Sequence, residues 1–232
     1  MDSHRAKAEV PDLAALARLL ADATRASFCL ALLDGRAWTA AELARHAGVA
    51  ASTATSHLNL LVAGGLLAEE RRGRHRYVRL AGTRTAELIE NLASIAPRHP
   101  VEPGSLSAAS RHQSLARART CYDHLAGALG VSITDAMTRR GLLGCEENLA
   151  LTGDGTDWLT TLGITLPPAR KRPLVRSCLD WTERRPHLAG AVGAALCSHA
   201  FSSGWITRIG TGRAVALTDT GRKALQEHLG IV

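Results

Sequence analysis

Apolar residues recur at helical spacing through most of the first hundred positions. A first helix, from about residue 11 to 21, is predicted by Leu13, Leu16, Leu19 and Leu20. A second helix can be capped by Asp22 and stops at Asp34-Gly35, and its apolar positions are Phe28, Leu30, Leu32 and Leu33. A later amphipathic helix, over residues 83–95, is predicted by Leu88, Leu92 and Ile95. This part of the chain is therefore expected to be mainly helical.

The stretch between these helices changes from a helical to a strand pattern. A short amphipathic helix is predicted over residues 39–46, a turn at Gly48 and a second helix over residues 52–62. Residues 66–80 are predicted to form two strands joined at Gly73. The order helix, tight turn, helix and β-ribbon is typical of a module that presents one helix to the major groove of DNA.

Several segments of this module resemble the ArsR/SmtB family of winged-helix repressors. They are Leu20-Ala-Asp22-Ala-Thr24-Arg25, Thr39-Ala-Ala-Glu42-Leu43-Ala44, Ser52-Thr53-Ala-Thr55-Ser-His57-Leu58-Asn-Leu-Leu61, Gly65-Leu66-Leu67 and Gly73-Arg74-His75-Arg76-Tyr77. The resemblance covers about residues 13–96. It implies a homodimer, joined through its first and fifth helices, that binds a pseudo-palindromic operator in double-stranded DNA. It also implies repression that ends when an effector binds.

The second helix of the module is predicted to place small polar side chains outward, because Leu58 and Leu61 share its inner face with Leu43 and Val49. The strands carry Arg71, Arg72, Arg74, Arg76 and Arg79 within nine residues that contain no acid. We therefore predict that DNA contacts Arg45, Ser52, Thr53, Thr55, Ser56, His57, Asn59, Arg71, Arg72, Arg74, His75 and Arg76.

Two features depart from the family pattern. Ala50 stands where a polar residue usually caps the recognition helix, and Ser56 and Asn59 replace basic residues along it. The arginines of the strands and Arg45 must then supply most of the attraction to phosphate. The alternatives are that the hydroxyl-rich helix start is only a solvated cap and that His57 only packs.

Residues 97–110 are rich in proline, glycine and serine and are predicted to be a linker. Beyond them, His124-Leu-Ala-Gly-Ala-Leu-Gly130 returns as His187-Leu-Ala-Gly-Ala-Val-Gly193, which indicates a degenerate duplication of about residues 117–164 and 176–231. Each copy is predicted to be a helix, a second helix that ends at a glycine, a short hairpin and a final helix. Two copies favour a pseudo-symmetric pair. Neither matches the arginine density of the first module, and one has the acidic Cys145-Glu-Glu-Asn148.

The predicted fold class is accordingly mainly α with small β-hairpin wings. The chain is divided into a winged helix-turn-helix domain (residues 1–96), a linker (residues 97–110) and a duplicated helical domain (residues 111–232) for effector sensing or dimer contacts. The second domain resembles a degenerate winged helix.

Metal ligands are possible in the duplicated domain, although both metal sites familiar in the family are absent. Cys121 and His124 are three residues apart on a predicted helix, so both could face one ion, and the second copy holds Cys178, His187, Cys197 and His199. Packing is the preferred interpretation, because His124 recurs at His187 whereas Cys121 has no evident counterpart. We therefore assign no metal and no required cofactor, and we keep Cys121, His124, Cys178 and His187 as candidates for a metal- or thiol-sensing site.

Other side chains of the duplicated domain could hold a small-molecule effector. Trp158, Trp181 and Trp205 could line an apolar pocket, or be ordinary core anchors. The basic clusters Arg184-Arg185 and Arg170-Lys-Arg172 could bind an acidic ligand or be solvated surface.

Composition limits the remaining choices. The formal net charge of +7 comes almost entirely from arginine and favours an anionic partner. The five cysteines are widely spaced and odd in number, which favours reduced thiols. No apolar run could cross a membrane, and residues 1–5 do not resemble an export signal, so we expect a cytoplasmic protein with no membrane partner. No catalytic motif is present and an enzyme is not expected. A non-specific architectural DNA-binding protein is the rival class.

Overall fold

The computed structural model describes residues 10–98, 106–144, 149–166 and 172–231. Its packing divides the chain into two compact units. The first unit comprises residues up to 31 together with 37–81, and the second comprises residues 32–36 and 82–232. The predicted boundary at residue 96 does not coincide with this division, because α5 and the short segment 32–36 pack in the second unit.

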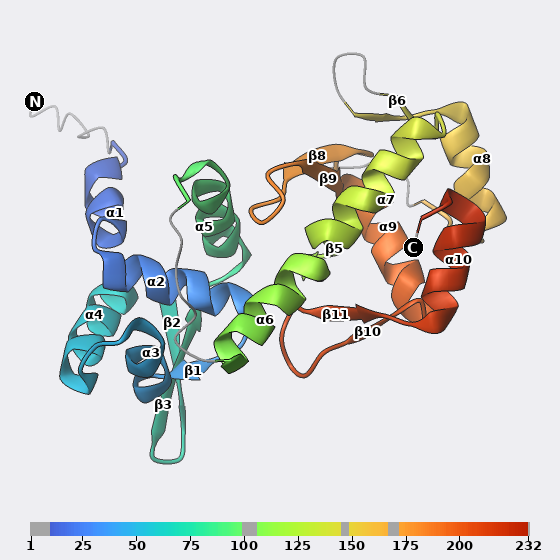
Figure 1. Cartoon of the computed structure of the whole chain (residues 1–232). Coiled ribbons are helices and arrows are strands. Elements are labelled where there is room, and N and C mark those ends of the chain that lie inside the picture. Colours follow the sequence, from blue (N-terminus) through green and yellow to red (C-terminus); the bar gives the residue numbers. More distant parts are fainter. Residues whose placement is uncertain (1–9, 99–105, 145–148, 167–171, 232) are drawn as a thin grey trace, which may run out of the picture. The chain divides into compact units, whose positions relative to one another are not determined.

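The first unit contains four helices and a three-stranded sheet in its described part (Figure 1). The helices are α1 (Leu13–Leu20), α2 (Ala23–Ala31), α3 (Ala40–Ala47) and α4 (Ala51–Ala63). The strands are β1 (Trp38–Thr39), β2 (Leu67–Arg72) and β3 (His75–Leu80), in the antiparallel order β1-β3-β2. This is the winged helix-turn-helix predicted from the sequence, with β2 and β3 as its wing.

Local sequence explains where these elements begin and turn. The Thr39 hydroxyl accepts the Glu42 N–H, and the Glu42 carboxylate accepts the Thr39 N–H at 2.7 Å, so the predicted capping box starts α3. Gly48 ends α3 in the left-handed conformation at φ 67° and sets the turn into α4. Gly73, at φ 58°, lies in the tight turn of the wing. The apolar core of the unit includes Phe28, Leu43, Leu58 and Leu61, all fully buried.

The second unit begins with a 3₁₀ turn, η1 (Leu32–Asp34), and includes α5 (Thr83–Ile95) and α6 (Leu106–Arg117). The first copy of the duplication consists of β4 (Arg119–Cys121), β5 (His124–Ala126), α7 (Gly127–Arg139), β6 (Leu143–Gly144), β7 (Ala150–Leu151) and α8 (Gly153–Thr161). The second copy consists of β8 (Arg176–Leu179), β9 (Pro186–Ala189), α9 (Gly190–Ser202), β10 (Ile206–Arg208), β11 (Val215–Leu217) and α10 (Asp219–Leu229). Helix α6 starts inside the predicted linker, of which residues 99–105 lie outside the described part.

The order of elements corrects one prediction. Each copy is a hairpin, a helix, a second hairpin and a final helix, so the predicted first helix is wrong in both copies. The glycines that open α7 and α9 explain this: Gly127 and Gly190 have φ 74° and 84°, and this left-handed start prevents the helix from extending back into the preceding residues. The other features recur faithfully, since Thr152 caps α8 and Thr218 caps α10 through equivalent 3.0 Å hydrogen bonds.

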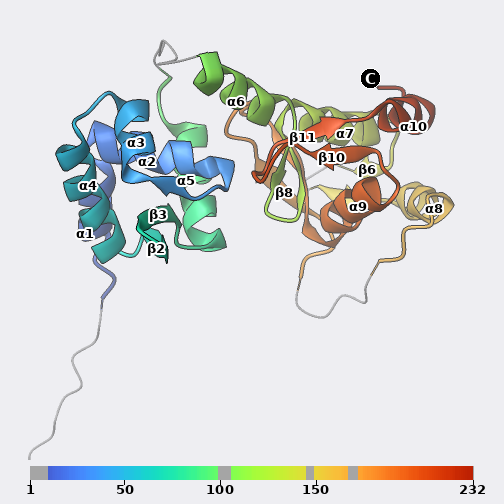
Figure 2. The same cartoon turned by 90° about the horizontal axis from the view of Figure 1, so that it is seen from below.

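The two copies pack on each other reciprocally: β5 contacts α9, and β9 contacts α7. The Leu188 N–H donates to the Thr134 hydroxyl at 2.8 Å, which fixes β9 to α7. Helices α8 and α10 lie at one end of the unit (Figures 1 and 2), and β5, β8 and β9 lie together away from that end (Figure 1). A single apolar cluster, built from both copies, fills the interior. The expected pseudo-symmetric pair is therefore present.

Of the helices in the described part, none is both long and apolar enough to cross a membrane. Residues 1–5, Cys145-Glu-Glu-Asn148 and Arg170-Lys171, on which some predictions rested, lie outside the described residues.

Candidate nucleic-acid interface

Helix α4 presents an exposed polar face, as predicted. Its inner side buries Ala54, Leu58 and Leu61. The predicted contact residues Ser52, Thr53, Thr55, Ser56 and Asn59 are all exposed. The hydroxyls of Thr55 and Ser56 donate to carbonyls one turn back, at 2.9 and 3.2 Å, so their oxygens remain able to accept. This face offers short donors and acceptors of the kind that can approach base edges.

The start of α4 has no side-chain cap, because Ala50 cannot supply one. The N–H groups of the first turn are thus left for an acceptor from outside the helix. Such a helix terminus attracts anions through these N–H groups and through the helix dipole. The departure from the family pattern at Ala50 is therefore compatible with a phosphate at this helix start.

His57 differs from the other predicted contact residues of α4, because it is half-buried and already engaged. Its Nδ1 lies 3.2 Å from Nη1 of Arg25 and 3.8 Å from a carboxylate oxygen of Asp22. Arg25 also donates to the carbonyls of Arg18 and Leu19, at 2.8 and 2.7 Å. The structure thus places His57 in a network that joins α4 to the start of α2.

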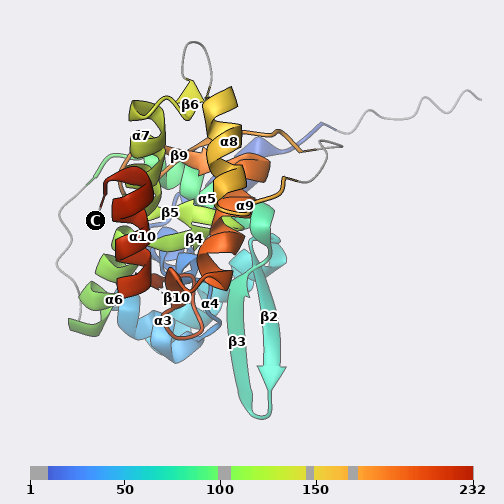
Figure 3. The ribbon, with the colours of Figure 1, turned by 90° about the vertical axis from the view of Figure 1, so that its right-hand side faces the viewer.

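The wing is a long, narrow hairpin that extends away from the helices of its unit (Figure 3). Arg71, Arg72, Arg74, His75 and Arg79 are exposed on it, as is Arg45 on α3. Arg76 is half-buried and donates to the Asn59 side-chain oxygen at 2.7 Å, which fixes β3 to α4. This hydrogen bond links one predicted contact residue of the wing to one of the helix.

Two acids missed as site residues lie in the wing. Glu69 pairs with Arg76 at 2.6 Å, and Glu70 pairs with Arg72 at 2.9 Å. The hydrogen bond from Arg72 lowers the pKa of Glu70 below its usual value. Since residues 71–79 contain no acid, the prediction overlooked the two glutamates that immediately precede them and that the hairpin brings opposite β3. In the described part of the wing, no ion pair engages Arg71 or Arg74.

The structure brings the four candidate metal ligands of the second unit together. One ligand atom from each of Cys121, His124, Cys178 and His187 lies within 4.8 Å of the others. The expectation that Cys121 and His124 share a helix is wrong, because they face each other across the hairpin β4–β5. Cys178 faces His187 in the same way across β8–β9, so Cys121 does have a counterpart. The sequence concealed this because the two hairpins have loops of different length.

The two thiols of this cluster influence each other. Interaction with Cys178, together with burial, raises the pKa of Cys121 to about 12. Interaction with Cys121 lowers the pKa of Cys178. Cys197 and His199 lie elsewhere on α9, where burial raises the pKa of the Cys197 thiol to about 12 and His199 packs edge-on against Trp205.

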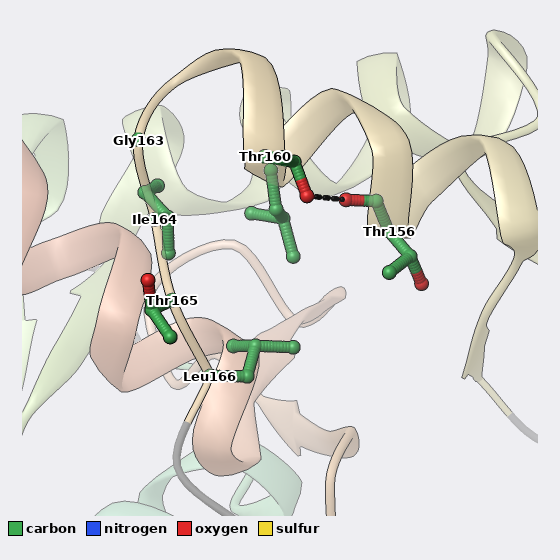
Figure 4. Close-up of a pocket in the computed structure, with 7 residues that line it drawn as sticks. Thr156, Thr160, Gly163, Ile164, Thr165 and Leu166 are labelled. Carbon is green, nitrogen blue, oxygen red and sulfur yellow. Dashed lines mark hydrogen bonds between the residues drawn. The ribbon is translucent and has the colours of Figure 1, made fainter.

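The three candidate tryptophans lie in different packing environments within the described part of the second unit. Trp158 packs at the edge of the apolar cluster, the Trp205 ring lies between His199 and His228, and Trp181 stacks under Arg119. One pocket of about 240 Å³ lies beside α8 and is lined by Thr156, Leu159, Thr160, Gly163, Ile164, Thr165 and Leu166 (Figure 4). A second, of about 210 Å³, opens onto Cys121 and Cys178. Neither has a tryptophan in its wall.

The described members of the basic clusters, Arg172, Arg184 and Arg185, are engaged within the second unit. Arg172 pairs with Asp123 at 2.5 Å, Arg185 pairs with Asp135 at 2.8 Å, and Arg184 donates to the Ala96 carbonyl. These contacts favour surface roles that hold the unit together.

Comparison with known proteins adds independent information. Residues 20–70 match the model of a family described as a helix-turn-helix domain. Among solved structures, the cadmium metal-sensor CMTR from Mycobacterium tuberculosis is 32% identical, and the match covers 39% of this chain and 97% of that protein with a TM-score of 0.32. The homodimeric winged helix-turn-helix DNA-binding domain of Mb0332 from Mycobacterium bovis is 24% identical, with 41% and 99% covered and a TM-score of 0.33.

A full-length relative decides the family. The HTH-type transcriptional regulator YdfF of Bacillus subtilis (strain 168) is 40% identical over 224 residues, and the match covers 95% of this chain and 98% of YdfF. It therefore extends through both copies of the duplication as well as the helix-turn-helix. Together with the observed winged helix-turn-helix, this match shows that the chain belongs to the HTH-type transcriptional regulators, which are DNA-binding proteins.

Proposed function

We propose that the protein is a homodimeric, sequence-specific repressor that reads an operator with α4, and that an effector bound in its second unit releases it. The observation that carries this proposal is the exposed polar face of α4, with an uncapped helix start, next to a wing of arginines. Small polar side chains suit base readout, and the wing arginines suit the flanking phosphates. A uniformly basic helix would instead favour binding without sequence preference.

Exposed apolar residues support a homodimer. Helix α1 has an apolar stripe but no buried residue in the single chain, and Leu13 is 73% exposed. On α5, Ile95 is 72% exposed. Exposed apolar residues that are neighbours on one helix face are typical of surfaces that a partner covers, and on α5 Leu92 is exposed beside Ile95. A second copy would also supply the second recognition helix that a two-fold operator requires.

Selection from random-sequence double-stranded DNA tests this function. We expect enrichment of a two-fold motif whose half-sites are about 10 base pairs apart, bound at least about 1,000-fold more tightly than unrelated DNA. Asn59→Ala should relax the preference at one base pair of each half-site, whereas Thr160→Ala on α8 should leave the motif unchanged. A reporter gene placed behind the motif should fall in expression when the protein is present. Equal affinity for all sequences would support an architectural protein instead.

A second prediction concerns the glutamates of the wing. Replacing Glu69 and Glu70 together with glutamine should tighten DNA binding on the order of tenfold at low salt, because two charges that repel phosphate are removed and Arg72 and Arg76 lose competing partners. The salt dependence of the affinity should become steeper.

The matched control is Asp157→Asn with Glu227→Gln, which changes the net charge equally at exposed positions of the second unit. Affinity measured by fluorescence anisotropy over a salt series should respond to the wing variant alone. An equal response of both variants would assign the effect to net charge and contradict the role of the wing.

A further inference from the structure

The Cys/His cluster of the second unit has the donor set of a closed metal site. It comprises Cys121 and His124 from the β4–β5 hairpin, and Cys178 and His187 from the β8–β9 hairpin. Two thiolates and two imidazoles in a tetrahedron are a preferred set for Zn²⁺. Cys121, His124 and His187 are buried and Cys178 is half-buried, so the site is sheltered from bulk water.

The two histidines are oriented as metal ligands usually are. Nδ1 of His124 lies 3.2 Å from an Asp123 carboxylate oxygen, and Nδ1 of His187 lies 3.2 Å from one of Asp180. A carboxylate beside Nδ1 favours the proton there and leaves the Nε2 lone pair available for a metal. Asp123 is held in turn by Arg172, and Asp180 by Arg119. His124 is thus hydrogen-bonded to its carboxylate, whereas Asp180 lies near the buried Nδ1 of His187 without an aligned hydrogen bond.

The distance between the histidines points to the same conclusion. Their Nε2 atoms lie 3.1 Å apart, and the rings face each other at a centroid distance of 5.1 Å. In the metal-free protein one ring can donate an Nε2–H to the other at this distance, and a cation between two unprotonated Nε2 atoms is attracted to both. With Zn–N bonds of about 2.0–2.1 Å, tetrahedral geometry sets two nitrogens about 3.3 Å apart. The observed spacing is close to that value.

Two glycines leave room for His124 and His187 to lie this close together. The other copy's helix carries a glycine at each histidine: a Cβ at Gly193 would lie 3.2 Å from the His124 Cβ, and one at Gly130 would lie 3.7 Å from the His187 Cβ. The pocket of about 210 Å³, lined in part by Glu87, Glu90 and Arg176, gives access to both cysteines from the surface. An ion can therefore reach the site without unfolding of the unit.

From these contacts we propose that Cys121, His124, Cys178 and His187 together bind one Zn²⁺ ion per chain, which cross-links the β4–β5 and β8–β9 hairpins. Each cysteine loses its thiol proton to solvent on binding, and each histidine binds as the neutral ring through Nε2. Cys121 now donates its thiol to the Glu90 carboxylate at 3.1 Å, and Glu90 keeps its partner Arg213 at 2.8 Å when that proton leaves. The site shares no residue with the proposed DNA-contacting set, so binding of the ion can be measured without DNA.

The test uses the full-length protein, kept reduced and stripped of metal by a chelator. Titration with Co²⁺ should give the intense visible bands of tetrahedral cobalt and the near-ultraviolet band of thiolate ligation, saturating at one ion per chain. Zn²⁺ should displace the cobalt with the same stoichiometry and raise Tm. Cys121→Ser and Cys178→Ser should each weaken Zn²⁺ binding more than about 100-fold, beyond the roughly 10–100-fold that the loss of an outer partner costs.

Two further variants make the outcome decisive. Cys197→Ala removes a buried thiol of the same unit that is not part of the cluster, and it should keep full metal binding. Asp123→Asn leaves all four ligands in place and should weaken Zn²⁺ binding about 10–100-fold. Circular dichroism of each metal-free variant establishes that it is folded. If the folded, reduced wild-type protein binds no Zn²⁺, or binds it equally after Cys121→Ser, the proposal is wrong.

Discussion

Replacing Arg72, Arg74 and Arg76 with alanine is expected to reduce the slope of log affinity against log salt by about 2–3, because each phosphate neutralised on duplex DNA contributes about 0.9. DNA affinity at low salt should fall on the order of 100-fold. Arg76 adds a further effect, since its hydrogen bond to Asn59 fixes the wing to the recognition helix. Sequence preference should therefore weaken as well as affinity.

The control for this variant removes three exposed positive charges from the second unit, Arg139, Arg140 and Lys223. Its net charge matches that of the wing variant. Any difference in DNA affinity or salt slope between the two variants is therefore due to where the charges lie and not to the total charge. The measurement is a binding isotherm at four or more salt concentrations. An unchanged slope in the wing variant would show that phosphate contacts lie elsewhere.

Asp180→Ala is expected to lower the free energy of unfolding of the second unit by about 3–5 kcal/mol, the usual cost of breaking a buried ion pair by removing one partner. Asp180 and Arg119 are both fully buried, and their charges meet at 3.0 Å. The Asp180 carboxylate also accepts the N–H groups of Gly127, Thr182 and Glu183. All these donors would remain buried or constrained without their acceptor.

Asp135→Asn is the matched comparison, because Asp135 pairs with Arg185 at 2.8 Å in a pair whose arginine is 57% exposed. It should cost no more than about 1 kcal/mol. Urea unfolding followed by circular dichroism measures both variants, and similar losses would contradict the role given to Asp180.

Because Asp180 titrates, its contribution to the stability of the second unit also depends on pH. Burial alone would raise the pKa of Asp180, but its contacts with His187 and Arg119 reverse this and hold it well below the usual value. A carboxylate with a depressed pKa in the folded state stabilises the fold above about pH 4, the unfolded value, and this contribution is lost as the pH falls.

Sequence patterns predicted the first unit well because its elements are long and have clear boundaries. The Thr39–Glu42 capping box, Gly48 and the inner leucines of α4 each determine one local feature, and the structure has all of them. What the patterns could not give was the pairing across the wing, where Glu69 and Glu70 come opposite Val78 and Tyr77. That depends on strand register, which spacing along the chain did not reveal.

The second unit was predicted less well for a physical reason. Strands such as Arg119–Cys121 and His124–Ala126 are three residues long and buried on both sides, so they show no alternation that distinguishes them from a helix. The four candidate ligands were named from the sequence, but packing was preferred because only the strand pairing shows that each cysteine faces a histidine. Asp180 gave no signal because Arg119 and Gly127, which it contacts, are distant in sequence.

The reciprocal packing of the two copies has an evolutionary consequence. Arg119 and Arg176 occupy the same register position, opposite Ala126 and Ala189, yet Arg119 is buried against Asp180 while Arg176 is exposed and lies 3.8 Å from Glu87. In a pair of identical chains every substitution appears on both sides of the symmetry axis. Fusion into one chain removes that constraint, so one half could acquire a buried charge while its twin kept a solvated arginine.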